Sequence, residues 1–229
     1  MLMQNLVQRG NARHPPQWKA PHPTTATDSA TFASVDPMGL PMPFSRNAEI
    51  YGEAEPADYV YKVLTGAVRI YRILDDGRRQ ISAFCLPGEV FGLEAGDEHH
   101  CSAEAVTDCT VLVIRRSALV ARARQDGETA HQLWAVAARE LECVQDHMLL
   151  LIQNAEQRVA SFLLEMARRV SSDSFELPMP RQDIADYLGL TIETVSRTLT
   201  HLQASAIIAV PTCRRIVLRS RKALRRLHA

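Results

Sequence analysis

The sequence lacks the features that define several classes of protein. Its five cysteines are scattered and odd in number, and no two of them form a CxxC pair. This pattern is typical of free thiols in a reducing compartment rather than of structural disulfides. No apolar run is long enough to span a bilayer, and the opening MLMQNLVQRG contains no apolar signal segment. We therefore expect a cytoplasmic protein with no membrane partner.

The chain also has no net charge, because 26 Lys and Arg balance 26 Asp and Glu. The two signs are distributed unevenly. Residues 156–229 carry twelve Lys and Arg against seven Asp and Glu, a net charge of +5, so the rest of the chain carries −5. A basic segment in a neutral chain favours contact between that segment and a polyanion.

Four segments follow one another along the chain. Residues 1–43 hold seven of the twelve prolines and show no hydrophobic period, so we expect a disordered extension. Residues 44–126 contain short β-rich runs separated by turns, including Asp75-Asp76-Gly77, a strong hairpin signal. Several such strands at short spacing predict a jelly-roll barrel. The runs are residues 59–64, 67–74, 80–85, 103–106 and 110–114.

A long helix is predicted over residues 127–154. Apolar residues along it step by three or four positions, which is the near-heptad spacing of a narrow seam. An amphipathic helix lying on its own barrel has a wider stripe, so the seam favours pairing with a second copy of the chain. The expected dimer interface is made by Leu133, Ala137, Leu141, Val144, Met148 and Leu151.

Residues 155–229 form the fourth segment, and its informative stretch begins at Pro180. PRQDIADYLG predicts a short helix with Ile184 and Leu188 on one face, ended by Gly189. Thr191 is a suitable N-cap for a second helix. Two short helices joined by a glycine turn predict a helix-turn-helix, whose second helix fits the DNA major groove.

The second helix has two faces. We expect Ile192, Val195, Leu199 and Leu202 to be buried because they share a helical face. Glu193, Ser196 and Arg197 lie on the opposite face, where Arg can bond guanine and Glu can accept from cytosine. Residues 207–210 and 215–218 predict two strands around a basic turn, which is a wing. The residues expected at DNA are Thr191, Glu193, Thr194, Ser196, Arg197, Arg214 and Arg215. The basic tail contains Arg219, Arg221, Lys222, Arg225 and Arg226, which we expect to add phosphate contacts.

The order of barrel, long helix and winged helix-turn-helix resembles the Crp–Fnr family over about residues 46–229. Residues 186–191 followed by Glu193-Thr194-Val195-Ser196-Arg197 are similar to the Fnr branch, whose E-x-x-S-R motif reads a TTGAT/ATCAA palindrome. Residues 54–61 and 77–81 resemble the FixK subgroup, which controls genes of low-oxygen respiration and nitrogen fixation. The resemblance implies an activator that binds double-stranded DNA as a homodimer. It also implies a contact of Asp75 and Asp76 with RNA polymerase, because the hairpin tip of related activators touches it.

The departures from that family predict a protein without a cofactor. Fnr holds an iron–sulfur cluster on cysteines near its N-terminus, whereas residues 1–84 here contain none. Cyclic-AMP-responsive relatives use an Arg in the phosphate pocket, and the matching stretch from Gly88 to Ser102 has no Arg. His99, His100 and Cys101 combine metal-binding side chains, but neighbours on a strand point to opposite faces. We therefore expect no metal there.

The expected fold class is α+β, with a cyclic-nucleotide-binding-like jelly-roll barrel, a dimerisation helix and a winged helix-turn-helix. Two alternatives share the barrel: a haem- or small-ligand-gated sensor of the same fold, and a ligand-sensing module that signals without DNA. The residues do not fit an oxygenase, because His99-His100 lacks the His-x-His spacing and the only later barrel-side His, His131, is predicted on the long helix. No G-x-S-x-G nucleophile motif occurs either. The sequence therefore predicts a regulator and not an enzyme.

Overall fold

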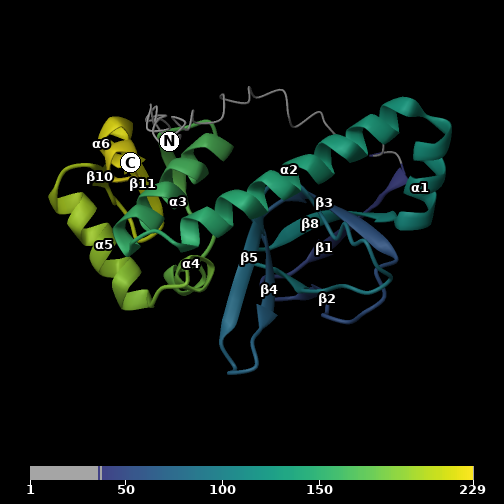
Figure 1. The fold of residues 1–229 in the computed structure, drawn as a ribbon, viewed down its shortest axis with the longest axis horizontal. Helices are drawn as coiled ribbons and strands as arrows, with labels where there is room; N and C mark the ends of the chain where they lie inside the picture. Colours follow the sequence, from purple (N-terminus) through teal and green to yellow (C-terminus); the bar gives the residue numbers. More distant parts are fainter. Residues whose placement is uncertain (1–35, 37, 229) are drawn as a thin grey trace, which may run out of the picture.

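The computed structural model describes residue 36 and residues 38–228 (Figure 1). The predicted extension therefore lies largely outside the described residues. Its end differs from the prediction: a strand begins at Leu40 and pairs with the last barrel strand, so the barrel starts before residue 44. The barrel strands are β1 (Leu40–Phe44), β2 (Glu49–Tyr51), β3 (Tyr59–Thr65), β4 (Val68–Ile73), β5 (Arg79–Cys85), β6 (Val90–Phe91), β7 (Ser102–Ala105) and β8 (Cys109–Arg115).

The barrel consists of two four-stranded sheets with the strand orders β1-β8-β3-β6 and β2-β7-β4-β5. Every strand pair is antiparallel, and the inward side chains form an apolar core that includes Tyr51, Tyr61 and Phe91. The β4–β5 hairpin turns at Gly77, whose φ of 82° suits a residue without a side chain. The predicted barrel is confirmed, although β2 and β6 are too short to show a periodic pattern.

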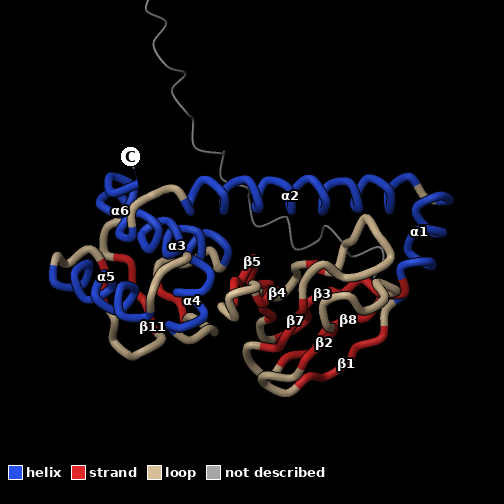
Figure 2. The backbone as a smooth tube through the Cα atoms, turned by 60° about the horizontal axis from the view of Figure 1, so that its bottom comes forward, coloured by secondary structure: helices blue, strands red, loops and turns tan. Residues whose placement is uncertain are grey.

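Two helices follow the barrel: α1 (Arg116–Gln125) and α2 (Gly127–Leu151). The sequence did not reveal α1, because only Leu119 of its ten residues is buried and no apolar stripe runs along it. Asp126 separates the helices and caps α2 by accepting a hydrogen bond from the backbone N–H of Glu128. Figure 2 shows α2 extending from the barrel to the C-terminal helices.

The C-terminal part contains α3 (Ala155–Arg169), β9 (Ser174–Glu176), α4 (Arg181–Leu188), α5 (Ile192–Ala204), β10 (Ile208–Ala209), β11 (Arg215–Leu218) and α6 (Arg221–His228). Its strands form one antiparallel sheet in the order β10-β11-β9, so the wing has a third strand that the sequence did not indicate.

The barrel and the C-terminal part share a continuous apolar core. Phe84 of β5 lies 6.5 Å from Phe162 of α3 and 5.4 Å from Tyr187 of α4, measured between ring centroids. Ile81 belongs to the same buried cluster as Leu163 and Leu188. The two parts are therefore packed together. Of the helices α4 and α5, it is α4 that faces β5 (Figure 1).

Candidate nucleic-acid interface

The turn between α4 and α5 has the predicted geometry. Gly189 ends α4 with a φ of 61°, in the left-handed region. Arg158 of α3 stabilises the turn, because its guanidinium donates a hydrogen bond to the Leu188 carbonyl at 2.8 Å. Thr191 caps α5 by accepting a hydrogen bond from the Thr194 N–H at 3.2 Å. The N-terminus of α5 is thus held in one position relative to α3 and α4.

The two faces of α5 separate as predicted, with one correction. Val195, Leu199 and Leu202 are buried in the domain core. Ile192 is 37% exposed rather than buried, because it is the first residue of the helix and lies beyond the edge of that core. Glu193 and Arg197 are exposed on the opposite face and lie one helical turn apart.

The other predicted residues of α5 differ in how free they are. Ser196 is half-buried, and its hydroxyl accepts a hydrogen bond from Arg181 of α4 at 3.2 Å. The backbone N–H of Glu193 and the Thr191 hydroxyl lower the pKa of the Glu193 carboxyl, and Arg197 adds to this effect. Glu193 is therefore fully ionised at neutral pH and can act only as an acceptor.

The wing places its two arginines differently. Arg215 is exposed at the start of β11, and its guanidinium donates to the Ser174 hydroxyl at 3.3 Å. Arg214 is half-buried and reaches the Pro178 carbonyl at 3.5 Å. Arg215 is thus the wing cation that is freer to meet a phosphate.

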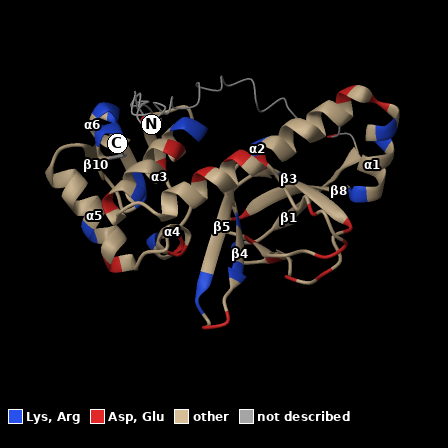
Figure 3. Ribbon diagram, in the orientation of Figure 1, with Lys and Arg blue, Asp and Glu red and all other residues tan. Residues whose placement is uncertain are grey.

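Most of the basic tail belongs to α6, on the side of the domain away from the α4–α5 turn. α6 packs on α3 through Leu224, and Figures 1 and 2 show α4 and the start of α5 on the other side of α3. The cations of α6 stand out in Figure 3 on the side away from that turn. The expected phosphate contact of the tail therefore stays a prediction, and it would involve a different side of the domain from the one that carries the α4–α5 turn.

The exposed apolar stripe of α2 differs from the predicted dimer seam at its two ends. Leu133 and Leu151 are half-buried within the chain, and Leu133 packs on the barrel core. Trp134 and Ile152, which are 72% and 82% exposed, occupy those ends of the outward stripe. Both are large apolar residues that directly follow a predicted position, so the sequence contained the signal for them. The exposed middle of the stripe contains Ala137, Leu141, Val144 and Met148, as predicted.

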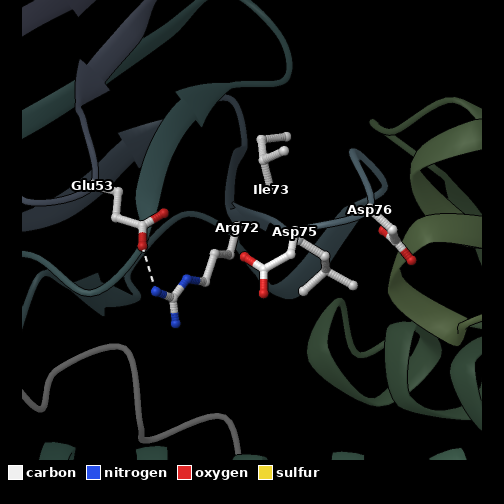
Figure 4. Close-up of a pocket in the computed structure, with 6 residues that line it drawn as sticks. Glu53, Arg72, Ile73, Asp75 and Asp76 are labelled. Carbon is white, nitrogen blue, oxygen red and sulfur yellow. Dashed lines mark ion pairs between the residues drawn. The ribbon is translucent and has the colours of Figure 1, made fainter.

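The β4–β5 hairpin presents both predicted aspartates at its tip, beside an open hollow that also involves Glu53 and Arg72 (Figure 4). Asp76 accepts hydrogen bonds from the Arg78 N–H at 3.0 Å and the Arg78 guanidinium at 2.7 Å, which hold the pKa of Asp76 below its ordinary value. Asp75 lies on the side of the tip nearer Arg72 (Figure 4).

The stretch that corresponds to the phosphate pocket of cyclic-AMP-responsive relatives runs from Gly88 to Ser102. Glu89 forms an ion pair with Arg169 of α3 and accepts a hydrogen bond from the Leu86 N–H at 2.9 Å, so its carboxylate is already engaged. Residues 88–102 contain Glu89, Glu94, Asp97 and Glu98 and no Lys or Arg. This stretch therefore offers a cyclic phosphate no cation of its own.

The histidine pair does not converge on one point. His99 is buried and stacks on Tyr51 with ring centroids 3.6 Å apart, whereas His100 is exposed. The Nδ1 of His99 lies 3.4 Å from a Glu94 oxygen. Among the residues that the structure describes, no group of three or more His, Cys, Asp or Glu is arranged to hold a metal ion. None of the described helices is long and apolar enough to cross a membrane.

Comparison with known proteins agrees with this architecture. Residues 41–126 match the cyclic nucleotide-binding domain, and residues 157–227 match the Crp-like helix-turn-helix domain. The chain is 50% identical over 210 residues to the nitrogen fixation regulation protein FixK of Azorhizobium caulinodans. The alignment covers 88% of this chain and 85% of that protein. It is 45% identical over 181 residues to the FixK of Rhizobium meliloti, which covers 78% and 82%.

The structure of FixK2 from Bradyrhizobium japonicum superimposes on this chain with a TM-score of 0.80 and 52% identity, over 83% of this chain and 98% of that one. Fold and exposed helix together define a DNA-binding transcription regulator rather than an enzyme. The chain belongs to the Crp–Fnr family and, within it, to the FixK-like branch.

Proposed function

We propose that this protein binds a TTGAT/ATCAA-like palindrome as a homodimer and activates genes of low-oxygen respiration or nitrogen fixation, without a cofactor. The observation that supports it most directly is the pair formed by Glu193 and Arg197, exposed on a helix whose other face is buried. The FixK relatives are named as nitrogen fixation regulators, which supports the choice of genes.

The geometry of α5 suits direct reading of a G·C pair. The Arg197 guanidinium can donate to both O6 and N7 of guanine, while Glu193 accepts from the amino group of cytosine. Attraction between the two side chains keeps the Arg197 side chain extended before DNA arrives. Arg215 adds a phosphate contact from the wing, which contributes affinity without sequence preference.

The test of this readout is the substitution Arg197→Ala. Loss of a bidentate contact costs roughly 1–3 kcal/mol per half-site, and about twice that for a palindrome read by two copies. The measurement is a titration against the palindrome and against the same duplex with the predicted G·C pairs changed to A·T. The matched control is Arg225→Ala, because Arg225 is an exposed arginine of α6 in the same domain.

The Arg225 variant should keep the wild-type preference, and the Arg197 variant should bind the two duplexes nearly equally. Retention of the wild-type ratio by Arg197→Ala would falsify the assignment of this face. Thermal stability should be unchanged in both variants, because neither side chain is buried.

The dimer rests on the outward stripe of α2. Leu141, Val144 and Met148 are large apolar side chains exposed on one face of a 25-residue helix. A stripe of this kind is stable in water when a second copy covers it. Two copies joined there would present two α5 helices to successive major grooves about one helical turn apart.

Activation is assigned to the hairpin tip, where Asp75 and Asp76 can meet a basic surface of RNA polymerase. Changing both to Ala should reduce transcription from a promoter whose site overlaps the −35 region, with DNA affinity unchanged. Glu98→Ala, which removes an exposed acid elsewhere on the barrel, is the control. If transcription by the double variant equals that of the control, the tip is only a turn.

A further inference from the structure

A buried cluster of charged side chains connects the barrel to the helix-turn-helix. Asp183 of α4 is 2% exposed and accepts hydrogen bonds from two arginines of the barrel. The Arg69 Nη1 lies 2.6 Å from one of its carboxylate oxygens, and the Arg79 Nη2 lies 2.5 Å from the other. Both oxygens of Asp183 are therefore engaged by residues more than a hundred positions away in the chain.

The arginines are themselves held from other directions. Arg69 of β4 also donates to Glu104 of β7 at 2.5 Å, so its guanidinium bridges the barrel sheet and α4. Arg79 of β5 donates through Nε to Asp186 of α4 at 2.9 Å. Each cation thus has a partner on α4 and a position set by its own strand.

The covalent link between the two parts is a short break between two helices. Only residues 152–154 separate α2 from α3, and none of the three is helical. The apolar contact between Phe84 and Phe162 tolerates sliding, because dispersion and hydrophobic forces depend weakly on direction. Hydrogen bonds between charged groups depend strongly on distance and angle.

We propose that Asp183 is a specificity-determining residue: by locking α4 onto Arg69 and Arg79, it sets the spacing between the two DNA half-sites that the dimer accepts. This inference rests on the proposed function, since it concerns a dimer that reads a palindrome. α2 carries the dimer axis and lies on the barrel, and α5 moves with α4. The docking of α4 on the barrel therefore fixes the distance from each α5 to that axis.

Loss of the Asp183 charge should release this docking rather than unfold the domain. Arg69, which is buried, and Arg79, which is half-buried, would lose their shared carboxylate in the closed arrangement, and both recover hydration if α4 moves away from the barrel. Within the shared apolar core, α3, α4 and α5 also pack on one another through Leu163, Val195 and Leu202, so the C-terminal domain keeps apolar contacts of its own when α4 leaves the barrel. A movable domain would accept half-sites at several spacings.

The experiment compares the full-length wild type with Asp183→Asn on three palindromes, with the spacer at its natural length or changed by one base pair either way. The wild type should prefer one spacer, and the variant should lose that discrimination by about tenfold or more. The matched control is Asp173→Asn, because Asp173 pairs with Arg221 inside the C-terminal domain and contacts no barrel residue among the pairs described. Arg79→Gln, at the solvent side of the cluster, is the second variant if Asp183→Asn does not fold.

Two further readouts separate the possible failures. Small-angle scattering without DNA should give a larger radius of gyration for Asp183→Asn than for Asp173→Asn. A duplex with a single half-site should bind the wild type and both variants alike, because α5 is unchanged. Unchanged spacer discrimination in Asp183→Asn and Arg79→Gln would overturn the role of Asp183. A wild type that prefers no palindrome over the single half-site would instead overturn the proposed function.

Discussion

The inner and outer sides of the helix-turn-helix use the same kinds of side chain in opposite ways. On the inner side, Asp183 is almost fully buried and is held by two arginines of the barrel. On the outer side, Glu193 and Arg197 are exposed, and water and salt weaken their mutual attraction without removing it. Similar charges are therefore buried and paired on one side and exposed on the other, where we propose that they recognise DNA.

The difference indicates where substitutions act on stability and where they act on partners. A charge that is buried and paired is costly to disturb, because its removal leaves other charges without hydration. An exposed charge contributes little to the free energy of folding, and its substitution mainly affects the binding of a partner. The apolar stripe of α2 resembles the outer side in this respect, because its residues are also exposed in the single chain and are free to meet a partner.

The largest effect should follow from a change in that stripe. Leu141→Lys would place an ammonium group from each copy within the apolar dimer contact, at a cost on the order of 5 kcal/mol in dimer stability for the two copies. Analytical ultracentrifugation should find a monomer, and affinity for the palindrome should fall accordingly.

Glu142→Lys is the control for this change. It introduces the same ammonium group one residue along α2, in place of a carboxylate, at an exposed position that points away from the stripe. A dimeric Leu141→Lys protein would mean that the stripe has another use.

An intermediate effect is expected at the turn between α4 and α5. Gly189→Ala places a Cβ 3.4 Å from the Arg158 guanidinium and 3.6 Å from Leu151, so there is room for the atom. The φ of +61° nevertheless disfavours alanine by about 1–2 kcal/mol. Thermal unfolding should register this loss. Gly96→Ala, whose Cβ would meet no atom within 4 Å, should be nearly neutral. Equal melting temperatures for the two variants would contradict the strain argument.

The smallest effect concerns pH and the inner side. His147 of α2 donates from Nε2 to the Tyr187 carbonyl at 2.8 Å and stacks on the Tyr187 ring. Burial lowers the pKa of His147, an effect that its backbone hydrogen bonds partly offset.

Because the folded pKa is depressed, the unfolded chain takes up a proton first as the pH falls below about 6.5. Stability should therefore decrease from there down to the folded pKa and level off below it. His147→Gln keeps an N–H donor but does not titrate in this range, so its stability should lack this component. An identical pH dependence in the wild type and His147→Gln would exclude the histidine as its source.

The sequence by itself determined the local elements of this protein. Asp75-Asp76-Gly77 specified a hairpin because glycine accepts a positive φ, and Gly189 with Thr191 specified the end of α4 and the start of α5 for similar local reasons. The split between buried Val195 and exposed Arg197 followed from the helical period alone. Short strands and α1 were missed because two or three residues, or a helix with one buried side chain, carry no period.

Only the tertiary structure decided which of the charged residues are buried. Asp183 and Glu193 are both acids near the start of a short helix, and nothing in their neighbours distinguishes them. The docking of α4 on β4 and β5 buries Asp183 against Arg69 and Arg79, and the same docking leaves α5 facing outward. In the same way, contact with the barrel covers Leu133 and leaves Trp134 in the stripe. The physical reason is that burial of a side chain depends on contacts made across the fold, which local periodicity cannot specify.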